Sequence, residues 1–200
     1  MNYLVEHIGN VKKPNDRKYL AIHSMHPLRL EEVLGLQWRD IDFDNKVIHI
    51  NRAVTHPERN KPVIKPTKTE ASVRAVWLTD TAASYLKPLQ GAPDEFVIGG
   101  QEPISCQQVW RMREQIAKDI DFDEKITPKR MRPTVLTDLY NKTKDVKLVQ
   151  AAAGHTTAAM TMKHYVNPRE NVIKAGWVIE SVYGAEIAKE LQEPPSREPA

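Results

Sequence analysis

A helix that ends at a glycine near the end of the chain is the feature that most constrains the fold. Val146, Val149 and Ala153 recur at helical spacing, which predicts a short helix with one apolar face. Gly154 follows directly, and glycine readily adopts the left-handed conformation in which many helices end. The residues after Gly154 are therefore expected on a turn rather than inside a packed element.

Two ring side chains follow this helix end. His155 comes immediately after the stop, and Thr156 or Thr157 can cap a second short helix. Tyr165 lies one short helix downstream, so the unit can hold both rings near one point. Taken alone, the stretch also fits a packing unit, because tyrosines are commonly half-buried. The rest of the chain has to decide between these interpretations.

Length and composition limit the class of protein. The chain has 200 residues, which is enough for one domain with a sizeable core. Its net charge is only +3, so a nucleic-acid partner would have to be met by a local basic patch. The single cysteine, Cys106, excludes an intramolecular disulfide and fits a reducing compartment. No apolar run approaches the roughly 20 residues of a membrane span, and no secretory signal follows Met1, so we expect a soluble cytoplasmic protein.

A helix is predicted from Pro27, because proline suits the first helical position. Arg29 would then fall in the first turn, where the helix dipole favours carboxylates over cations. That placement indicates a role for Arg29 other than capping. The predicted apolar stripe consists of Leu30, Val33, Leu34 and Trp38.

The middle of the chain predicts strands and then further helices. Residues 46–54, 62–66 and 72–78 read as strands, and the last two flank a polar turn at 67–70. We expect them to form a small antiparallel sheet. Thr79 and Ser105 can cap helices that extend to Leu86 and to about Ile120. The predicted fold class is α+β, mainly α-helical.

Residues 127–141 predict one more helix with a basic start. Pro133 suits the first turn of a helix and pushes the preceding residue, Arg132, into an extended conformation outside it. Lys129 and Arg130 precede this point. Arg130 is the rival of Arg132 for any role that needs a guanidinium group here.

Taken together, these segments resemble the tyrosine recombinases, the phage-integrase family. The family's first arginine box matches from Arg29 to Asp42 as Arg-x-x-Glu-x-x-x-Leu-x-Trp-x-Asp-Ile-Asp, with His26-Pro27 where the family usually has Thr-Gly. The family's lysine, at or near a hairpin, corresponds to Lys68 in the stretch 66–76.

The two later boxes follow in the family's order. The pattern His-x-x-Arg-His-Thr corresponds to residues 129–134, with Arg132 in register and with Lys129 and Pro133 in place of the two histidines. The Leu-Gly-His box corresponds to residues 153–155, with Ala153 in place of leucine, and the family's tyrosine corresponds to Tyr165. Each box is weak alone, but four in order and spacing are specific.

The resemblance implies a fold, an activity and a set of site residues. The fold is the recombinase catalytic fold, with a small antiparallel three-stranded sheet on one edge. The activity is DNA strand breakage and rejoining through a 3′-phosphotyrosine, without metal, ATP or cofactor. The implied catalytic residues are Arg29, Lys68, Lys129, Arg132, His155 and Tyr165, and the implied nucleic-acid-binding residues are Lys65, Thr67 and Arg130.

The resemblance also implies partners and domain organisation. The partner is double-stranded DNA with attachment-type sites, and the enzyme integrates or excises a phage or other mobile element. A homotetramer on DNA is expected, with exchange of a C-terminal helix whose apolar face includes Val172, Trp177 and Val178. Residues 1–191 would form the catalytic domain and 192–200 a disordered tail. The family's N-terminal arm- and core-binding domains are expected to be absent from this stretch.

Three other classes of function stay open at this point. The chain can be a DNA-binding relative without catalysis, which Lys129 and Pro133 favour. It can be a type IB topoisomerase, which shares the chemistry, carries a lysine at the position of Lys129, and relaxes supercoils. A helical protein-interaction domain fits the ordered boxes least well.

Overall fold

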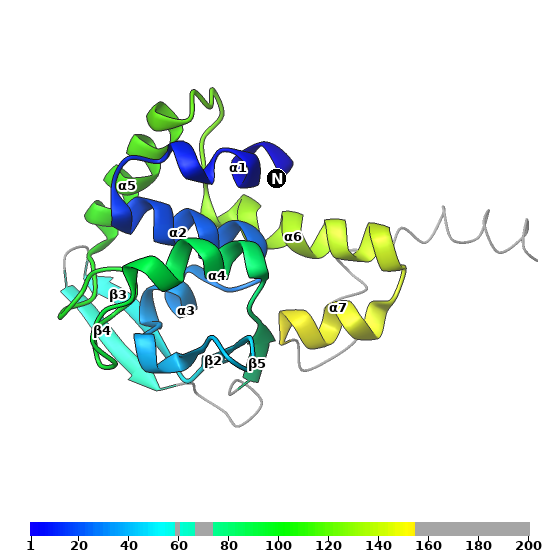
Figure 1. Ribbon diagram of the computed structural model, residues 1–200, viewed down its shortest axis with the longest axis horizontal. Helices are drawn as coiled ribbons and strands as arrows, with labels where there is room; N and C mark the ends of the chain where they lie inside the picture. The colour runs from blue at the N-terminus through cyan, green and yellow to red at the C-terminus, as the bar shows by residue number, and fades with distance from the viewer. Residues whose placement is uncertain (59–60, 67–73, 155–200) are drawn as a thin grey trace, which may run out of the picture. The chain divides into compact units, whose positions relative to one another are not determined.

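The computed structural model describes residues 1–58, 61–66 and 74–154. Helices dominate, and short strands occupy the first half of the chain (Figure 1). The helices are α1 Asn2–Glu6, η1 Ile8–Asn10, α2 Pro14–Met25, α3 Leu30–Gly35, η2 Trp38–Asp40, α4 Asp80–Leu86, η4 Lys87–Leu89, α5 Cys106–Asp119, α6 Pro128–Thr143 and α7 Val146–Ala153. The strands are β1 Ile41–Asp42, β2 Val47–Ile50, β3 Arg52–Glu58, β4 Lys61–Pro66 and β5 Arg74–Trp77.

The central element of the core is α2. It contacts α1, α3, α4, α5 and α6, and every residue from Tyr19 to Ser24 is buried. Burial over this stretch means that a polar side chain there needs a partner inside the protein. His23 places Nδ1 3.0 Å from the hydroxyl oxygen of Tyr19. These five helices pack around α2.

A three-stranded antiparallel sheet is present, in the order β1-β2-β5. Ile41 lies opposite Ile48, and Ile50 lies opposite Arg74. The prediction of a mainly helical α+β fold with such a sheet is therefore confirmed.

The membership of the sheet differs from the prediction. Residues 46–54 do not form one strand, because the chain leaves β2 at Asn51 and enters β3 in a separate hairpin with β4. The side chains of Asn51 and Arg52 both bond to the buried carboxylate of Asp40, which fixes the turn between the two sheets. Residues 62–66 consequently pair with β3, and β5 pairs with β2 instead.

The first predicted helix starts later and ends earlier than expected. Pro27 is buried before the helix, and Arg29 occupies the N-cap position with extended backbone angles (φ −72°, ψ 153°). The helix ends at Gly35, where a Cβ would lie 2.8 Å from the carbonyl oxygen of Arg52. Trp38 therefore lies in η2 rather than in the same helix.

The prediction that Arg132 is extended and outside a helix was wrong. Helix α6 begins at Pro128, so Arg132 lies inside it and Pro133 is an internal proline. An internal proline removes one backbone hydrogen bond, here the one to the carbonyl of Lys129. Tertiary hydrogen bonds of Arg132, described below, hold this turn in helical form in spite of that loss.

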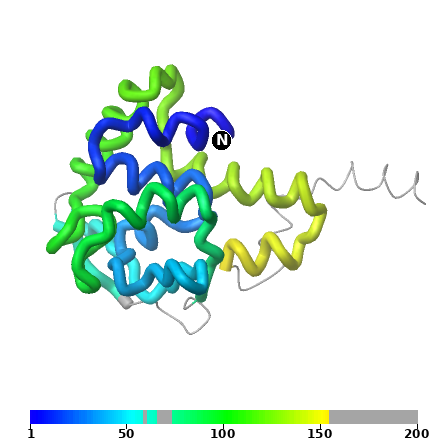
Figure 2. The backbone as a smooth tube through the Cα atoms, viewed as in Figure 1, coloured from blue at the N-terminus to red at the C-terminus, as the bar shows by residue number. Residues whose placement is uncertain are grey.

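Several local predictions are confirmed. The hydroxyl groups of Thr79 and Ser105 accept hydrogen bonds at the starts of α4 and α5. Gly154 ends α7 in the left-handed region (φ 63°). Figure 2 shows α7 returning beside α6, which it contacts. The predicted C-terminal helix and the tail at 192–200 lie outside the described residues.

Candidate active site

The start of α3 brings together an arginine and a glutamate from the first box. The backbone nitrogen of Arg29 donates to Oε2 of Glu32 at 2.8 Å, and its Nη1 donates to Oε1 at 2.9 Å. Glu32 occupies the N3 position, where a carboxylate satisfies free backbone N–H groups and complements the helix dipole. The Arg29 side chain keeps 44% of its surface exposed, so it remains accessible to a ligand.

Strand β5 supplies a second arginine to the same carboxylate. Nη1 of Arg74 donates to Oε1 of Glu32, and Nη2 donates to Oε2, both at 2.9 Å. This is the bidentate geometry in which a planar guanidinium matches a carboxylate. The Glu32 side chain is buried and that of Arg74 is nearly so, with 7% and 10% of their surfaces exposed.

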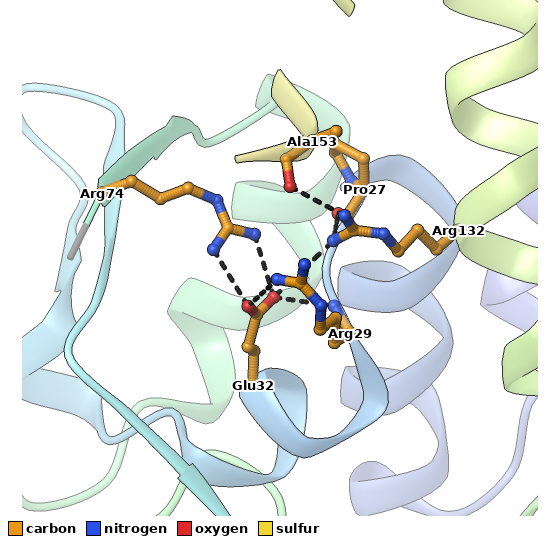
Figure 3. A network of polar contacts seen from close by, with 6 residues as sticks. All are labelled: Pro27, Arg29, Glu32, Arg74, Arg132 and Ala153. Atoms are coloured by element: carbon orange, nitrogen blue, oxygen red, sulfur yellow. Dashed lines mark hydrogen bonds and ion pairs between the residues drawn. The ribbon is translucent and has the colours of Figure 1, made fainter. Parts of the chain in front are cut away.

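Helix α6 supplies the third arginine. Nη1 of Arg132 donates to the carbonyl of Pro27 at 2.8 Å, and Nη2 donates to the carbonyl of Ala153 at 2.7 Å. Its Nη1 also lies 3.9 Å from Oε2 of Glu32. Figure 3 shows Arg74 and Arg132 reaching Glu32 from opposite sides, with Arg29 between them.

The Arg132 contact to Ala153 satisfies a helix end. The last carbonyl groups of a helix have no partner within it, and they form the negative end of its dipole. A guanidinium bonded to the final residue of α7 meets both needs. The same side chain therefore connects the segment before α3 to the Gly154 turn.

The charges of this cluster leave it strongly positive. Burial alone would raise the pKa of the Glu32 carboxyl, but hydrogen bonds and charge from Arg74, with further hydrogen bonds from Arg29, lower it to about 2. Glu32 is therefore ionised at neutral pH. Three guanidinium groups surround one carboxylate, so a net charge of +2 remains for an anion such as a phosphodiester.

The two other predicted residues of α6, Lys129 and Arg130, differ in their position relative to Arg132. Lys129 is exposed and lies three residues before Arg132, so both project from neighbouring positions on one helix face. Arg130 is exposed and forms an ion pair with Glu124 at 2.6 Å. Arg132 is therefore the guanidinium of this helix that reaches the cluster, and Arg130 is not.

The other predicted residues belong to the β3–β4 hairpin or lie outside the described part of the chain. Lys65 is exposed on β4, opposite Ala53 of β3. The remaining predicted residues, Thr67, Lys68, His155 and Tyr165, lie outside the described part of the chain.

Sequence reasoning missed the central carboxylate and its bidentate partner. Glu32 was part of the first box without a role, although its spacing of three from Arg29 is the spacing of a capping box. Arg74 stood in the lysine box without a role. No local signal distinguishes Arg74, because its partner is 42 residues away in sequence.

The described residues contain neither a cluster of metal-ligating side chains nor a helix able to span a membrane. No three histidine, cysteine, aspartate or glutamate side chains in these ranges are grouped to hold a metal ion. Within the same ranges, every helix is too short or too polar to span a bilayer.

Comparison with curated proteins gives distant relatives. The tyrosine recombinase XerS of Streptococcus gordonii is 26% identical over 169 residues, covering 80% of this chain and 45% of that protein. The tyrosine recombinase XerD of Halalkalibacterium halodurans is 26% identical over 134 residues, covering 67% of this chain and 43% of that protein. The chain thus spans under half the length of these relatives.

Comparison with solved structures gives the same fold. The Tn1549 transposon integrase in complex with a circular intermediate DNA superposes with a TM-score of 0.69 at 20% identity, covering 88% of this chain and 62% of that one. The XerH site-specific recombinase bound to difH substrate gives a TM-score of 0.61 at 22% identity, covering 86% and 49%.

One family model matches most of the chain. The model of the phage integrase family matches residues 1–171, which include the arginine cluster and all four sequence boxes. The chain therefore belongs to the phage integrase family.

Proposed function

We propose that this chain is the catalytic part of a site-specific DNA recombinase that cuts and rejoins strands through a 3′-phosphotyrosine. The observation that supports it most is the meeting of Arg29 and Arg132 at one carboxylate, from boxes about 100 residues apart. Two guanidinium groups held this way can bind the non-bridging oxygens of a scissile phosphate. The DNA-bound structures of the Tn1549 integrase and XerH support DNA as the substrate.

The reaction needs a nucleophile, charge stabilisation and a proton. The hydroxyl oxygen of Tyr165 attacks phosphorus and gives its proton to water or to His155, and the bond from phosphorus to the 5′-oxygen breaks. Lys68 gives a proton to the departing 5′-oxygen, and His155 or Lys129 assists by hydrogen bonding or proton transfer. The phosphotyrosine retains the bond energy, so the 5′-hydroxyl of another strand can reverse the step without ATP.

The arginines supply the positive charge in this mechanism. Loss of one preorganised donor of this kind typically costs about 100-fold or more in rate. Arg29 is the more accessible of the two, and Arg132 is fixed by backbone carbonyls. We further propose that the enzyme acts on a phage or other mobile element, as a tetramer that exchanges C-terminal helices, with residues 1–191 as the catalytic domain.

The direct test is capture of the covalent intermediate. The full-length protein is incubated with supercoiled plasmids carrying the genomic DNA that flanks its gene, stopped with detergent, and the DNA attached to protein is sequenced. A nicked suicide duplex built on that site then measures adduct formation. Wild-type protein should form the adduct, and Tyr165→Phe should form none while retaining its melting temperature and DNA affinity.

Matched tyrosines control this test. Tyr140→Phe and Tyr183→Phe change the same group at positions that lack the spacing of Tyr165 from Gly154-His155, since Tyr140 comes before this pair and Tyr183 well beyond Tyr165. Both variants should still form the adduct. Adduct formation by Tyr165→Phe at the wild-type rate would refute the mechanism. DNA binding without an adduct in wild-type protein would favour a non-catalytic relative. Relaxation of plasmids without joining of two duplexes would favour a topoisomerase.

A further inference from the structure

Arg74 connects three parts of the candidate site that lie far apart in sequence. It lies on β5, it holds Glu32 of α3 by two hydrogen bonds, and it lies against the Gly154 turn. A Cβ built on Gly154 would lie 2.7 Å from both Cδ and Nε of Arg74. A side chain at position 154 would therefore have to displace the Arg74 guanidinium, and the positive φ of Gly154 is strained for any residue with a Cβ.

The two hydrogen bonds from Arg74 fix the orientation in which the Glu32 carboxylate binds Arg29. Each carboxylate oxygen accepts one hydrogen bond from Arg74 and one from Arg29. Without Arg74, the glutamate could rotate about its last bonds and carry the exposed Arg29 guanidinium with it. Fixing both oxygens fixes the direction in which Arg29 is presented.

Arg74 also lies close in sequence to the proposed general acid, because Lys68 precedes it by six residues. In space, Arg74 lies against Gly154, the residue immediately before His155 in sequence.

The pairing of Arg74 with Glu32 also stabilises the fold, because the buried carboxylate would lose two hydrogen bonds without it. The Nε of Arg74 is buried, and among the described residues no acceptor pairs with it. Arg74 therefore acts on Glu32 through its two terminal nitrogens, whose fork geometry a lysine cannot reproduce.

We propose that Arg74 is a positioning residue for DNA strand cleavage, which acts by orienting Glu32 and Arg29 and by bracing the Gly154 turn. It does not itself bind the phosphate in this arrangement. The proposal rests on the proposed strand-cleavage function. It predicts that a variant that keeps the positive charge but loses the fork slows cleavage without weakening DNA binding.

The test compares Arg74→Lys with wild-type full-length protein on the nicked suicide duplex. Three quantities are measured: the single-turnover rate of adduct formation at saturating DNA, the dissociation constant for DNA, and the melting temperature. A small misplacement of a catalytic group can cost about 100-fold in rate. We expect Arg74→Lys to form adduct about 10- to 100-fold more slowly, with a dissociation constant within about threefold of wild type.

Arg52→Lys is the matched control. Arg52 is also a mostly buried arginine, with 16% of its side chain exposed; it pairs with a buried carboxylate, Asp40, and lies outside the arginine cluster. It should lose melting temperature much as Arg74→Lys does, yet retain the wild-type rate of adduct formation. An equal slowing in both variants would assign the effect to stability and overturn the proposal.

The remaining outcomes are also decisive. Adduct formation by Arg74→Lys at the wild-type rate overturns the proposal and leaves the proposed function intact. A wild-type rate at saturating DNA with a dissociation constant raised beyond the expected range also overturns it, because Arg74 would then contribute to DNA binding and not to positioning. If Arg74→Lys does not fold, Arg74→Gln replaces it, and failure of both to fold assigns the residue to stability. Absence of adduct in wild-type protein refutes the recombinase function itself.

Discussion

Arg132 and Pro27 are 105 residues apart in sequence, and Nη1 of Arg132 donates a 2.8 Å hydrogen bond to the carbonyl of Pro27. This bond attaches α6 to the segment that leads into α3. Its companion bond from Nη2 attaches the same side chain to Ala153 at the end of α7. Arg132 is therefore a structural junction as well as a candidate phosphate ligand.

The substitution Arg132→Lys should destabilise the protein. One ammonium group cannot span the two carbonyls that the guanidinium fork bridges, and hydrogen bonds to charged groups contribute about 1.5 to 3 kcal/mol each. We expect a loss of about 2 kcal/mol in the free energy of unfolding, measured by urea titration. Arg130→Lys, on the same helix but exposed and paired with Glu124, should change it by less than about 0.5 kcal/mol. Equal effects of the two substitutions would contradict the role of Arg132 as a structural junction.

The sequence predicted several segments correctly, but it predicted the conformation of others wrongly. Helical periodicity and caps located α4, α5 and α7, because those signals are local. The prediction that Arg132 is extended was wrong because the preference of a residue before proline for extended backbone angles is only a local tendency. Tertiary hydrogen bonds to Pro27 and Ala153 override it. The strand pairing was wrong because the break at Asn51 depends on Asp40, which no local pattern reveals.

The core carboxylate of the site was not predictable for a related reason. Glu32 appears in sequence as an ordinary helix-start glutamate, and its burial among three arginines exists only in the folded chain. Arg74 has no periodic or capping signature. Its role follows from the antiparallel pairing of β5 with β2, which places it beside α3 and Gly154.

Protonation of Glu32 at low pH should lower the stability of the protein. The folded pKa of Glu32, about 2, lies below its ordinary value of 4.5, so the folded state binds this proton less readily than the unfolded state. The stabilisation is present above pH 4.5 and is lost as pH falls from 4.5 towards 2. The difference corresponds to about 3 kcal/mol. In urea titrations over this window, Glu32→Gln should show a shallower loss of stability with falling pH than wild type. Parallel curves would mean that Glu32 is not ionised in the cluster.

Protonation of His23 should lower the stability of the protein at a higher pH than protonation of Glu32 does. Burial, opposed by a backbone hydrogen bond with Leu28 and reinforced by the charges of Arg113 and Arg132, lowers the pKa of His23 to about 4. The neutral ring is therefore favoured in the folded state. Stability should begin to fall as pH drops below 6.5 and continue falling to about 4. His23→Asn keeps a partner for the Tyr19 hydroxyl and removes the titration, so its unfolding free energy should vary less between pH 6.5 and 4.5. An unchanged pH dependence in this variant would assign the loss to another group.

The role of Lys68 can be tested by changing the leaving group of the DNA. If Lys68 protonates the departing 5′-oxygen, Lys68→Ala should slow adduct formation by about 100-fold or more. A duplex with sulfur in place of that 5′-oxygen releases a thiolate, and thiols have pKa values of about 8.5, so no proton is needed. Lys68→Ala should then cleave the sulfur duplex at close to the wild-type rate. The measurement is single-turnover adduct formation on both duplexes.

Lys65 provides the matched control for this experiment. It is an exposed lysine on β4, three residues before Lys68 in sequence, and is a candidate contact to the DNA backbone rather than a proton donor. Lys65→Ala should weaken DNA binding and lower its salt dependence, because one phosphate contact is lost. At saturating DNA it should cleave the oxygen duplex at the wild-type rate and gain nothing from sulfur. If Lys68→Ala is equally slow on both duplexes, Lys68 acts on the phosphate charge or on DNA position, and another group supplies the proton.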